Sequence, residues 1–153
     1  MSHPRLLAAA AVLLALSGST GTPASAQSGS WFSATKLAEG VWRIDDNGSD
    51  NMYLVEGRDR ALLIDTGLGA ARLADYVKTL TAKPLLVVNT HGHPDHAGGN
   101  YQFKAVYAHP ADFDAARQVG TPEARARGLQ AMAKGKTASD MVTAEEAAAA
   151  KPA

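Results

Sequence analysis

The sequence predicts an α/β fold, because short apolar runs typical of strands alternate with segments of helical periodicity. Two pairs of short runs come first, and a helical segment, a continuous apolar run and further helical segments follow. The 153 residues suffice for one domain, and 46% hydrophobic with 20% charged residues is a globular composition. We therefore expect strands and helices packed in layers around one core.

The first four expected strands form two hairpins. Residues 35–38 and 41–44 are separated by a Glu-Gly turn signal, and residues 52–55 and 61–64 by a charged segment that contains Gly57. Short runs bounded by turn residues are typical of paired antiparallel strands.

Helices and strands alternate after these hairpins. Helical periodicity is expected over residues 69–80, where Leu73, Val77 and Leu80 share one face. Residues 85–88 are a continuous apolar run, which is typical of a strand buried on both faces. The last expected elements are a strand at 105–108, a helix from Pro110 to about Val119 and a helix capped by Thr121.

The N-terminal segment resembles a bacterial secretory signal. Arg5 precedes an unbroken apolar run at residues 6–16, and residues 24–26 form a small-x-small cleavage site. The run is about half of the roughly 20 residues that span a membrane, although an N-terminal anchor helix remains the alternative. We expect cleavage after Ala26 and a periplasmic or secreted protein with no stable membrane anchor. The expected divisions are a signal peptide (1–26), a leader (27–34), a domain (35–135) and an alanine-rich, low-complexity tail (136–153).

Charge and cysteine content narrow the function classes. Lys plus Arg and Asp plus Glu each number 15, so the formal net charge is zero and gives no field to gather nucleic acid. Cysteine is absent, which excludes disulfides, thiolate metal sites and a cysteine nucleophile. Any metal must therefore be held by histidine or carboxylate side chains.

A cluster of metal-ligand side chains follows the apolar run at 85–88. His91, His93, Asp95 and His96 lie within six residues, and three of the five histidines of the chain are among them. Imidazole and carboxylate suit Zn²⁺, with iron or manganese as alternatives. Because the cluster follows a buried strand, we expect it in a curled loop beyond the carboxyl end of the sheet.

This cluster resembles the H-x-H-x-D-H signature of the metallo-β-lactamase superfamily. The preceding Leu62–Gly67, a strand that ends in Asp-Thr-Gly, resembles the family's other N-terminal signature, and the resemblance covers about residues 35–119. It implies an αββα sandwich of two similar halves, of which this chain would supply the N-terminal half.

The resemblance also implies roles for the residues. His91 and His93 would hold one zinc ion, and Asp95 and His96 a second. Asp95 is also the candidate catalytic residue, and Asp65 would lie beneath the loop and orient a ligand.

The implied function is a secreted hydrolase in which metal-activated hydroxide attacks an ester, thioester, lactam or similar bond of a small-molecule substrate. The family's further ligands lie well downstream, whereas His109 is the one histidine after His96. We therefore expect a truncated hydrolase, with a non-catalytic metal-binding remnant as the alternative. His109 is either a surface residue or a substitute ligand. An exposed half sheet would also allow self-association.

Overall fold

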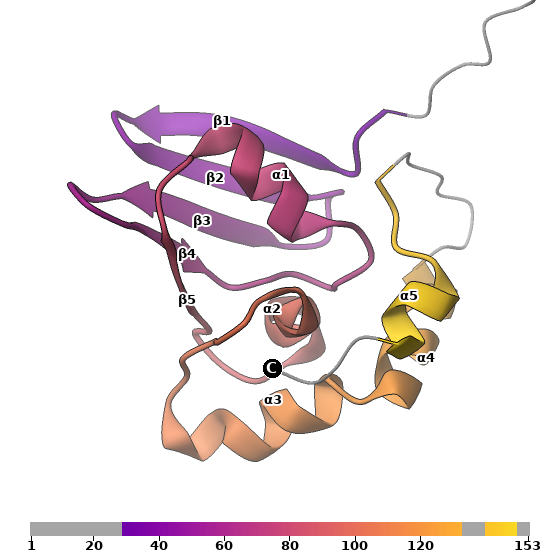
Figure 1. Ribbon diagram of the computed structural model, residues 1–153. Coiled ribbons are helices and arrows are strands. Elements are labelled where there is room, and N and C mark those ends of the chain that lie inside the picture. Colours follow the sequence, from indigo (N-terminus) through magenta and orange to yellow (C-terminus); the bar gives the residue numbers. More distant parts are fainter. Residues whose placement is uncertain (1–28, 133–139, 150–153) are drawn as a thin grey trace, which may run out of the picture.

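The computed structural model describes residues 29–132 and 140–149 and contains one five-stranded sheet (Figure 1). The strands lie side by side in sequence order, with antiparallel pairing up to β4 and parallel pairing between β4 and β5. The strands are β1 (Phe32–Ala38), β2 (Val41–Asp46), β3 (Asn51–Glu56), β4 (Ala61–Ile64) and β5 (Leu85–Val88).

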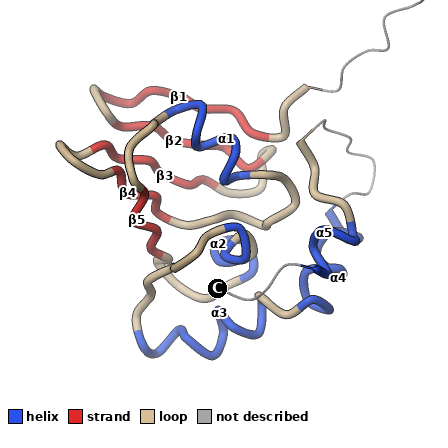
Figure 2. The backbone as a smooth tube through the Cα atoms, viewed as in Figure 1, coloured by secondary structure: helices blue, strands red, loops and turns tan. Residues whose placement is uncertain are grey.

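Helices cover one face of this sheet and the side where β4 and β5 lie. Figure 1 shows α1 across the sheet, and α2 and α3 on the side away from β1, while Figure 2 separates helices from loops by colour. The mixed α/β class expected from the sequence is confirmed. The helices are α1 (Leu73–Leu80), α2 (Pro94–Ala97), α3 (Phe113–Val119), α4 (Pro122–Met132) and α5 (Ala144–Ala149), with 3₁₀ turns η1 (Asn100–Gln102) and η2 (Pro110–Asp112).

Both expected hairpins and the strand at residues 85–88 are confirmed, but this strand is not buried on both faces, because Leu86 is exposed. Two further expected elements also differ. The helix expected from residue 69 begins at Leu73, because Gly69 has a φ of +73° and Ala71 pairs in a bridge with Met141. The prediction of a strand at residues 105–108 is wrong. Tyr107 makes a single parallel bridge with Val88, too little pairing for a strand.

The core lies between α1 and one face of the sheet. Leu73 and Val77 of α1 are fully buried, as are the side chains that this sheet face contributes from successive strands. The burial of a near-continuous apolar layer provides the main favourable free energy of folding. The sheet residues of this layer are Ile44, Met52, Leu54, Leu63 and Val87.

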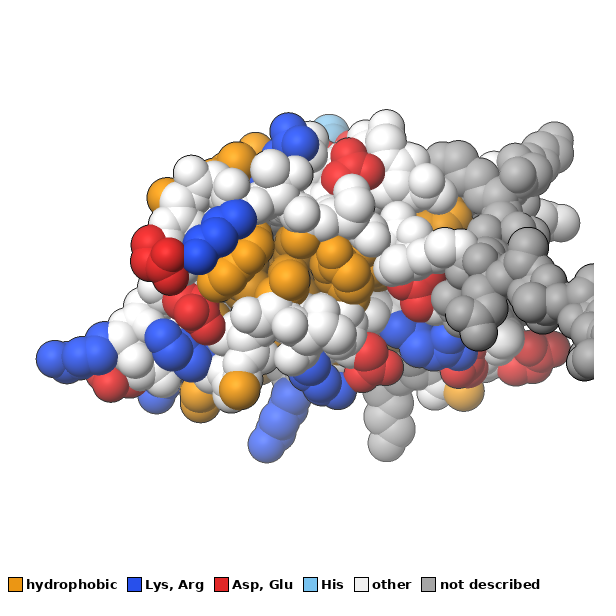
Figure 3. All heavy atoms as spheres, turned by 90° about the horizontal axis from the view of Figure 1, so that it is seen from above, with side chains coloured by type: hydrophobic (Ala, Val, Ile, Leu, Met, Phe, Trp, Pro, Cys, Tyr) orange, Lys and Arg blue, Asp and Glu red, His pale blue; other side chains and the backbone are white. Residues whose placement is uncertain are grey.

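The opposite face of the sheet is also apolar but is only partly covered by the described residues. Tyr53 of β3 and Leu86 of β5 are 38% and 36% exposed, and Leu62 between their strands is half-buried. Seen from the β1 side, a further patch of hydrophobic side chains lies among charged ones (Figure 3). A sheet that is apolar on both faces agrees with a position between two layers.

The segment 140–149 contacts the residues that precede β1 and α1, packs against α4, and lies within the expected low-complexity tail. Asp140 accepts hydrogen bonds from the backbone N–H of Trp31 and, through its carbonyl, of Arg72. Arg72 also forms an ion pair with Glu146 at 2.6 Å, and this partner lowers the pKa of Glu146 to about 2. The alanine-rich composition therefore did not predict that residues 140–149 are ordered against the rest of the domain.

Several sequence expectations lie outside the described residues. The signal peptide at 1–26 and part of the tail belong to segments that the structure does not describe. Among residues 29–132 and 140–149, no helix combines the length and apolar character needed to cross a membrane.

A buried carboxylate joins β1, β2 and the loop after β4. Asp46 is 1% exposed, and its two carboxylate oxygens accept from Trp31 Nε1 at 2.5 Å and from the backbone N–H of Leu68 at 2.7 Å. Burial raises the pKa of Asp46, and these two donors oppose that rise. The side chain thereby fixes the loop that leads from β4 towards α1.

We expect Asp46→Ala to lower the free energy of unfolding by about 1–3 kcal/mol, because the buried N–H of Leu68 loses its acceptor. Urea denaturation measures this change. Asp45→Ala, which removes an exposed hydrogen bond to Gly48, is the control and should change stability by only about 0.5 kcal/mol. Equal stabilities of the two variants would contradict the role of Asp46.

Candidate metal centre

The carboxyl ends of the two parallel strands create the site. Ile64 of β4 and Val88 of β5 are register partners, so Asp65 and Thr90 emerge at the same end of the sheet. The histidine-rich segment follows β5 directly, which confirms its expected place beyond the strand ends.

Backbone contacts clamp the loop after β4 against the histidine-rich segment. The backbone N–H of Thr66 donates to the carbonyl of His96 at 2.8 Å, and Gly99 N–H donates to the carbonyl of Gly67 at 3.2 Å. A Cβ atom on Gly99 would overlap the carbonyl oxygen of Thr66. The consecutive glycines of the sequence are thus explained by close approach of two backbones.

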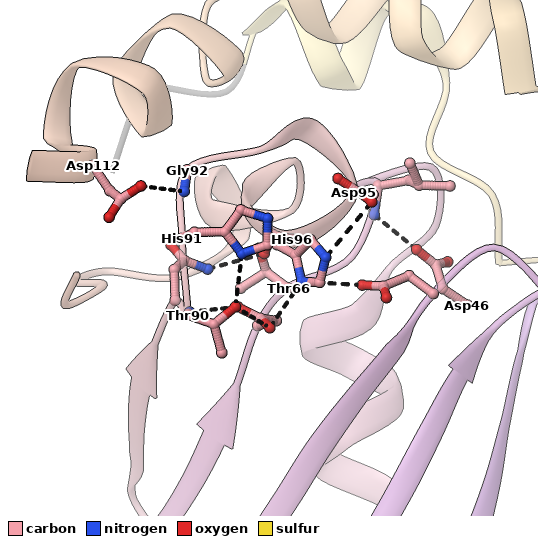
Figure 4. A network of polar contacts seen from close by, with 12 residues as sticks. Asp46, Thr66, Thr90, His91, Gly92, Asp95, His96 and Asp112 are labelled. Atoms are coloured by element: carbon pink, nitrogen blue, oxygen red, sulfur yellow. Dashed lines mark hydrogen bonds and ion pairs between the residues drawn. The ribbon is translucent and has the colours of Figure 1, made fainter. Parts of the chain in front are cut away.

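A short helix, rather than a curled loop alone, presents the second half of the cluster. His93 has extended backbone angles and precedes α2, and Pro94 takes the first helical position, where its missing N–H is not needed. Asp95 and His96 consequently lie on α2 and project towards His91 (Figure 4).

Three of the predicted ligands come together. His91, Asp95 and His96 each offer a ligand atom within 4.8 Å of the others. His96 Nε2 lies 3.6 Å from Asp95 Oδ2, and the rings of His91 and His96 are 4.1 Å apart at their centroids. Two imidazoles and a carboxylate are a donor set that suits zinc, so the residues fit the metal that the sequence predicts.

Asp65 lies beneath this group and orients it. Its Oδ1 accepts from the backbone N–H of Thr90 at 2.8 Å, and its Oδ2 accepts from Thr90 Oγ1 at 2.8 Å and lies 2.9 Å from His96 Nδ1. A proton on His96 Nδ1 satisfies this contact and leaves Nε2 as a free donor atom. Asp65 also has a φ of +64°, a strained angle that aspartate tolerates better than most residues.

The charges around His96 favour its protonated form in the free protein. Burial lowers the pKa of His96, but the hydrogen bond to Asp65 and the charges of Asp50, Asp65 and Asp95 outweigh burial and raise the pKa above its usual value. The same negative charge favours any cation bound at this point.

The other two histidines after the signal segment lie differently. His93 is exposed and outside the 4.8 Å group, although its ring stacks edge-on against His91 with centroids 4.6 Å apart. His109 is exposed and caps η2, because its Nδ1 accepts from the backbone N–H of Ala111 at 3.2 Å. This placement favours the surface interpretation of His109.

Sequence reasoning missed the polar residues that support α2 from below. Asn89 Nδ2 donates to the carbonyl of His96 at 2.9 Å, and Asn100 Nδ2 donates to Asn89 Oδ1 at 2.8 Å. Thr66 Oγ1 completes the chain by donating to Asn100 Oδ1. All three side chains are buried polar groups with partners, which rigidifies the helix that carries two of the predicted ligands. Thr66 and Asn89 follow strand ends in the sequence, whereas Asn100 in η1 has no such signal.

We expect Gly99→Ala to lower the free energy of unfolding by about 1–3 kcal/mol, because the new methyl group overlaps the carbonyl of Thr66. Gly128→Ala in α4, where nothing lies within 4 Å, is the control and should stabilise by about 0.5–1 kcal/mol. Denaturation midpoints measure both variants. An unchanged midpoint for Gly99→Ala would contradict the backbone clamp.

The chain is similar to known proteins in sequence and fold. Residues 45–112 match the sequence profile of the metallo-beta-lactamase superfamily. The acyl-coenzyme A thioesterase MBLAC2 of Homo sapiens is 33% identical over 102 residues, covering 56% of this chain and 37% of that protein. MBLAC2 of Gallus gallus is 38% identical over 96 residues, with coverages of 54% and 35%.

Among solved structures, the metallo-beta-lactamase FIM-1 from Pseudomonas aeruginosa in its mono-zinc form has a TM-score of 0.50 and 25% identity. That match covers 60% of this chain and 48% of FIM-1, and this chain spans well under half the length of the thioesterases. Sequence profile, relatives and fold agree with the two signatures read from the residues, and they support a partial match of this chain to the metallo-beta-lactamase superfamily over residues 45–112.

Proposed function

We propose that this chain carries the metal-binding part of an exported, metal-dependent hydrolase that acts on a thioester or a related acyl bond. The observation that carries the proposal is the convergence of His91, Asp95 and His96, with Asp65 holding His96 from behind. The thioesterase names of the curated relatives support the choice of bond. Export rests on the N-terminal sequence alone.

The proposed cofactor is zinc, as one or two ions, with iron or manganese as alternatives. His91, Asp95 and His96 would hold the ion together, and His93 would join them as the fourth donor, since its ring already touches that of His91. The chemistry that zinc supplies when bound is the activation of water as a nucleophile near neutral pH.

Within this site the side chains have distinct tasks. Asp65 keeps the proton on His96 Nδ1, so that Nε2 stays available as a donor. Asp95 is our candidate catalytic residue, because its side chain is 49% exposed and can accept a hydrogen bond from a water molecule at the mouth of the site.

An apolar pocket beside His93 supports an acyl substrate. It has a volume of about 320 Å³ and lies between the motif segment and helices α3 and α4. Such a pocket suits the hydrocarbon part of a small-molecule substrate whose carbonyl faces the metal ligands. Its walls include Gly92, His93, Pro94, Ala115, Val119 and Ala124.

The half-exposed sheet face supports a further proposal, self-association. Tyr53 and Leu86 offer apolar area on a face that the described residues leave partly open. A second apolar layer placed there would bury both side chains.

We expect the purified chain to bind zinc. The His96→Ala variant should bind much less zinc, because His96 supplies a donor atom and anchors the group through Asp65. Equilibrium dialysis with elemental analysis measures the stoichiometry. His109→Ala, which alters an exposed cap outside the group, is the matched control and should bind as the unaltered chain does. Equal zinc content in all three proteins would refute the site.

We expect zinc-dependent but slow hydrolysis of an acyl-coenzyme A thioester, with kcat below about 1 s⁻¹, the lower end of ordinary enzymes. The described residues leave the site open to solvent at Asp95, so they orient a substrate only loosely, and orientation supplies much of the rate. His96→Ala should abolish the zinc-dependent rate, and His109→Ala should keep it. Zinc-dependent rates that are the same with and without His96 would contradict the proposed function, whereas a kcat well above this limit would contradict only the expected slow rate.

A further inference from the structure

A second carboxylate reaches the back of His96 from a distant part of the chain. Asp50, in the turn between β2 and β3, has Oδ2 at 3.5 Å from His96 Nδ1. Its side chain is only 15% exposed, and Oδ2 is buried without a hydrogen-bond partner among the described residues. Asp65 lies closer to the same nitrogen, at 2.9 Å.

His96 Nδ1 forms its hydrogen bond with Asp65 and not with Asp50. His96 Nδ1 carries a single proton, and the shorter contact directs that proton to Asp65. Asp50 therefore adds negative charge at the imidazole without receiving a normal hydrogen bond. Burying such a carboxylate costs free energy in the metal-free protein, and a buried group of this kind calls for a functional explanation.

The turn holds Asp50 in this position. The backbone N–H of Asp46 donates to the carbonyl of Asp50 at 2.9 Å, and Ser49 N–H donates to the carbonyl of Asp46 at 3.0 Å. Asp46 is itself fixed by its buried side-chain contacts. Asp46 thus fixes the turn through its backbone, and this turn brings Asp50 close to His96.

We propose that Asp50 is a second positioning residue for His96, whose negative charge strengthens cation binding by the group of His91, Asp95 and His96. This inference rests on the proposed metal function. Asp50 holds the imidazole from the Nδ1 side together with Asp65, and its charge favours a divalent ion on the Nε2 side.

The proposal predicts opposite effects on stability and on metal affinity. Asp50→Asn removes a buried charge whose Oδ2 lacks a hydrogen bond. At a pH above the pKa of His96, where no imidazolium balances this charge, the metal-free protein should therefore become more stable. The same change removes charge behind His96, so metal should bind about tenfold more weakly, at the lower end of effects from residues that support metal ligands. If Asp50 had a merely structural role, its replacement would lower the stability of the metal-free protein.

The experiment uses Co²⁺ as an optical probe and Zn²⁺ in competition with it. Co²⁺ titration of the unaltered chain, Asp50→Asn and Asp50→Ser gives the dissociation constant and the visible absorption band, and urea denaturation gives metal-free stability. Asp45→Asn is the matched control, because it removes one charge from the end of β2 beside the same turn without contacting His96. We expect unchanged stoichiometry, about tenfold weaker binding in both Asp50 variants, and a raised denaturation midpoint for Asp50→Asn.

Unaltered affinity in the Asp50 variants, with normal binding by the parent chain, would overturn this inference and leave the proposed function standing. Weaker binding accompanied by lower metal-free stability, or failure of both variants to fold, would assign Asp50 a structural role and overturn it as well. Absence of metal binding by the parent chain would overturn the proposed function and this inference together.

Discussion

The carboxylate of Asp65 is the constraint on which the site depends. It accepts two hydrogen bonds from Thr90 at the end of β5 and faces His96 Nδ1 on α2, while its own backbone N–H donates to the carbonyl of Val88. One side chain thus joins the ends of two parallel strands to the helix that carries two of the predicted ligands. The strained backbone at Asp65 is the cost of aiming that carboxylate inwards, and the surrounding hydrogen bonds maintain it.

Local patterns in the sequence predicted most of the elements around this carboxylate. Alternating and continuous apolar runs located β2 to β5, because hydrophobic periodicity reflects which side chains a sheet buries. The spacing of Leu73 and Val77 located α1, and Thr121 caps α4 by accepting from the backbone N–H of Ala124. His91, Asp95 and His96 could be assigned to one site because they follow a buried strand within six residues.

Contacts between distant segments could not be predicted in this way. Asp46 and Asp50 look like ordinary loop residues in the sequence, and their roles depend on Trp31, Leu68 and His96, which come near only in the folded chain. The docking of residues 140–149 is also hidden, because an alanine-rich composition says nothing about Arg72 as a partner for Glu146. Conversely, residues 105–108 have strand-like composition, but β5 offers Tyr107 only a single bridge.

The close backbone approach of Gly99 to Thr66 and Gly67 allows the site to fold without a bound metal ion. Backbone groups of Thr66 and Gly67 hold His96 and Gly99 through hydrogen bonds that involve no ligand side chain. Small zinc domains that lack such a scaffold are unfolded without their ion, so that metal chelation and denaturation are one event. Here the conformational entropy of the ligand-bearing helix is lost when the chain folds, before any ion arrives. The proposed ion should therefore be removable by chelators to leave a folded apo form, and exchangeable for another ion without refolding of the chain.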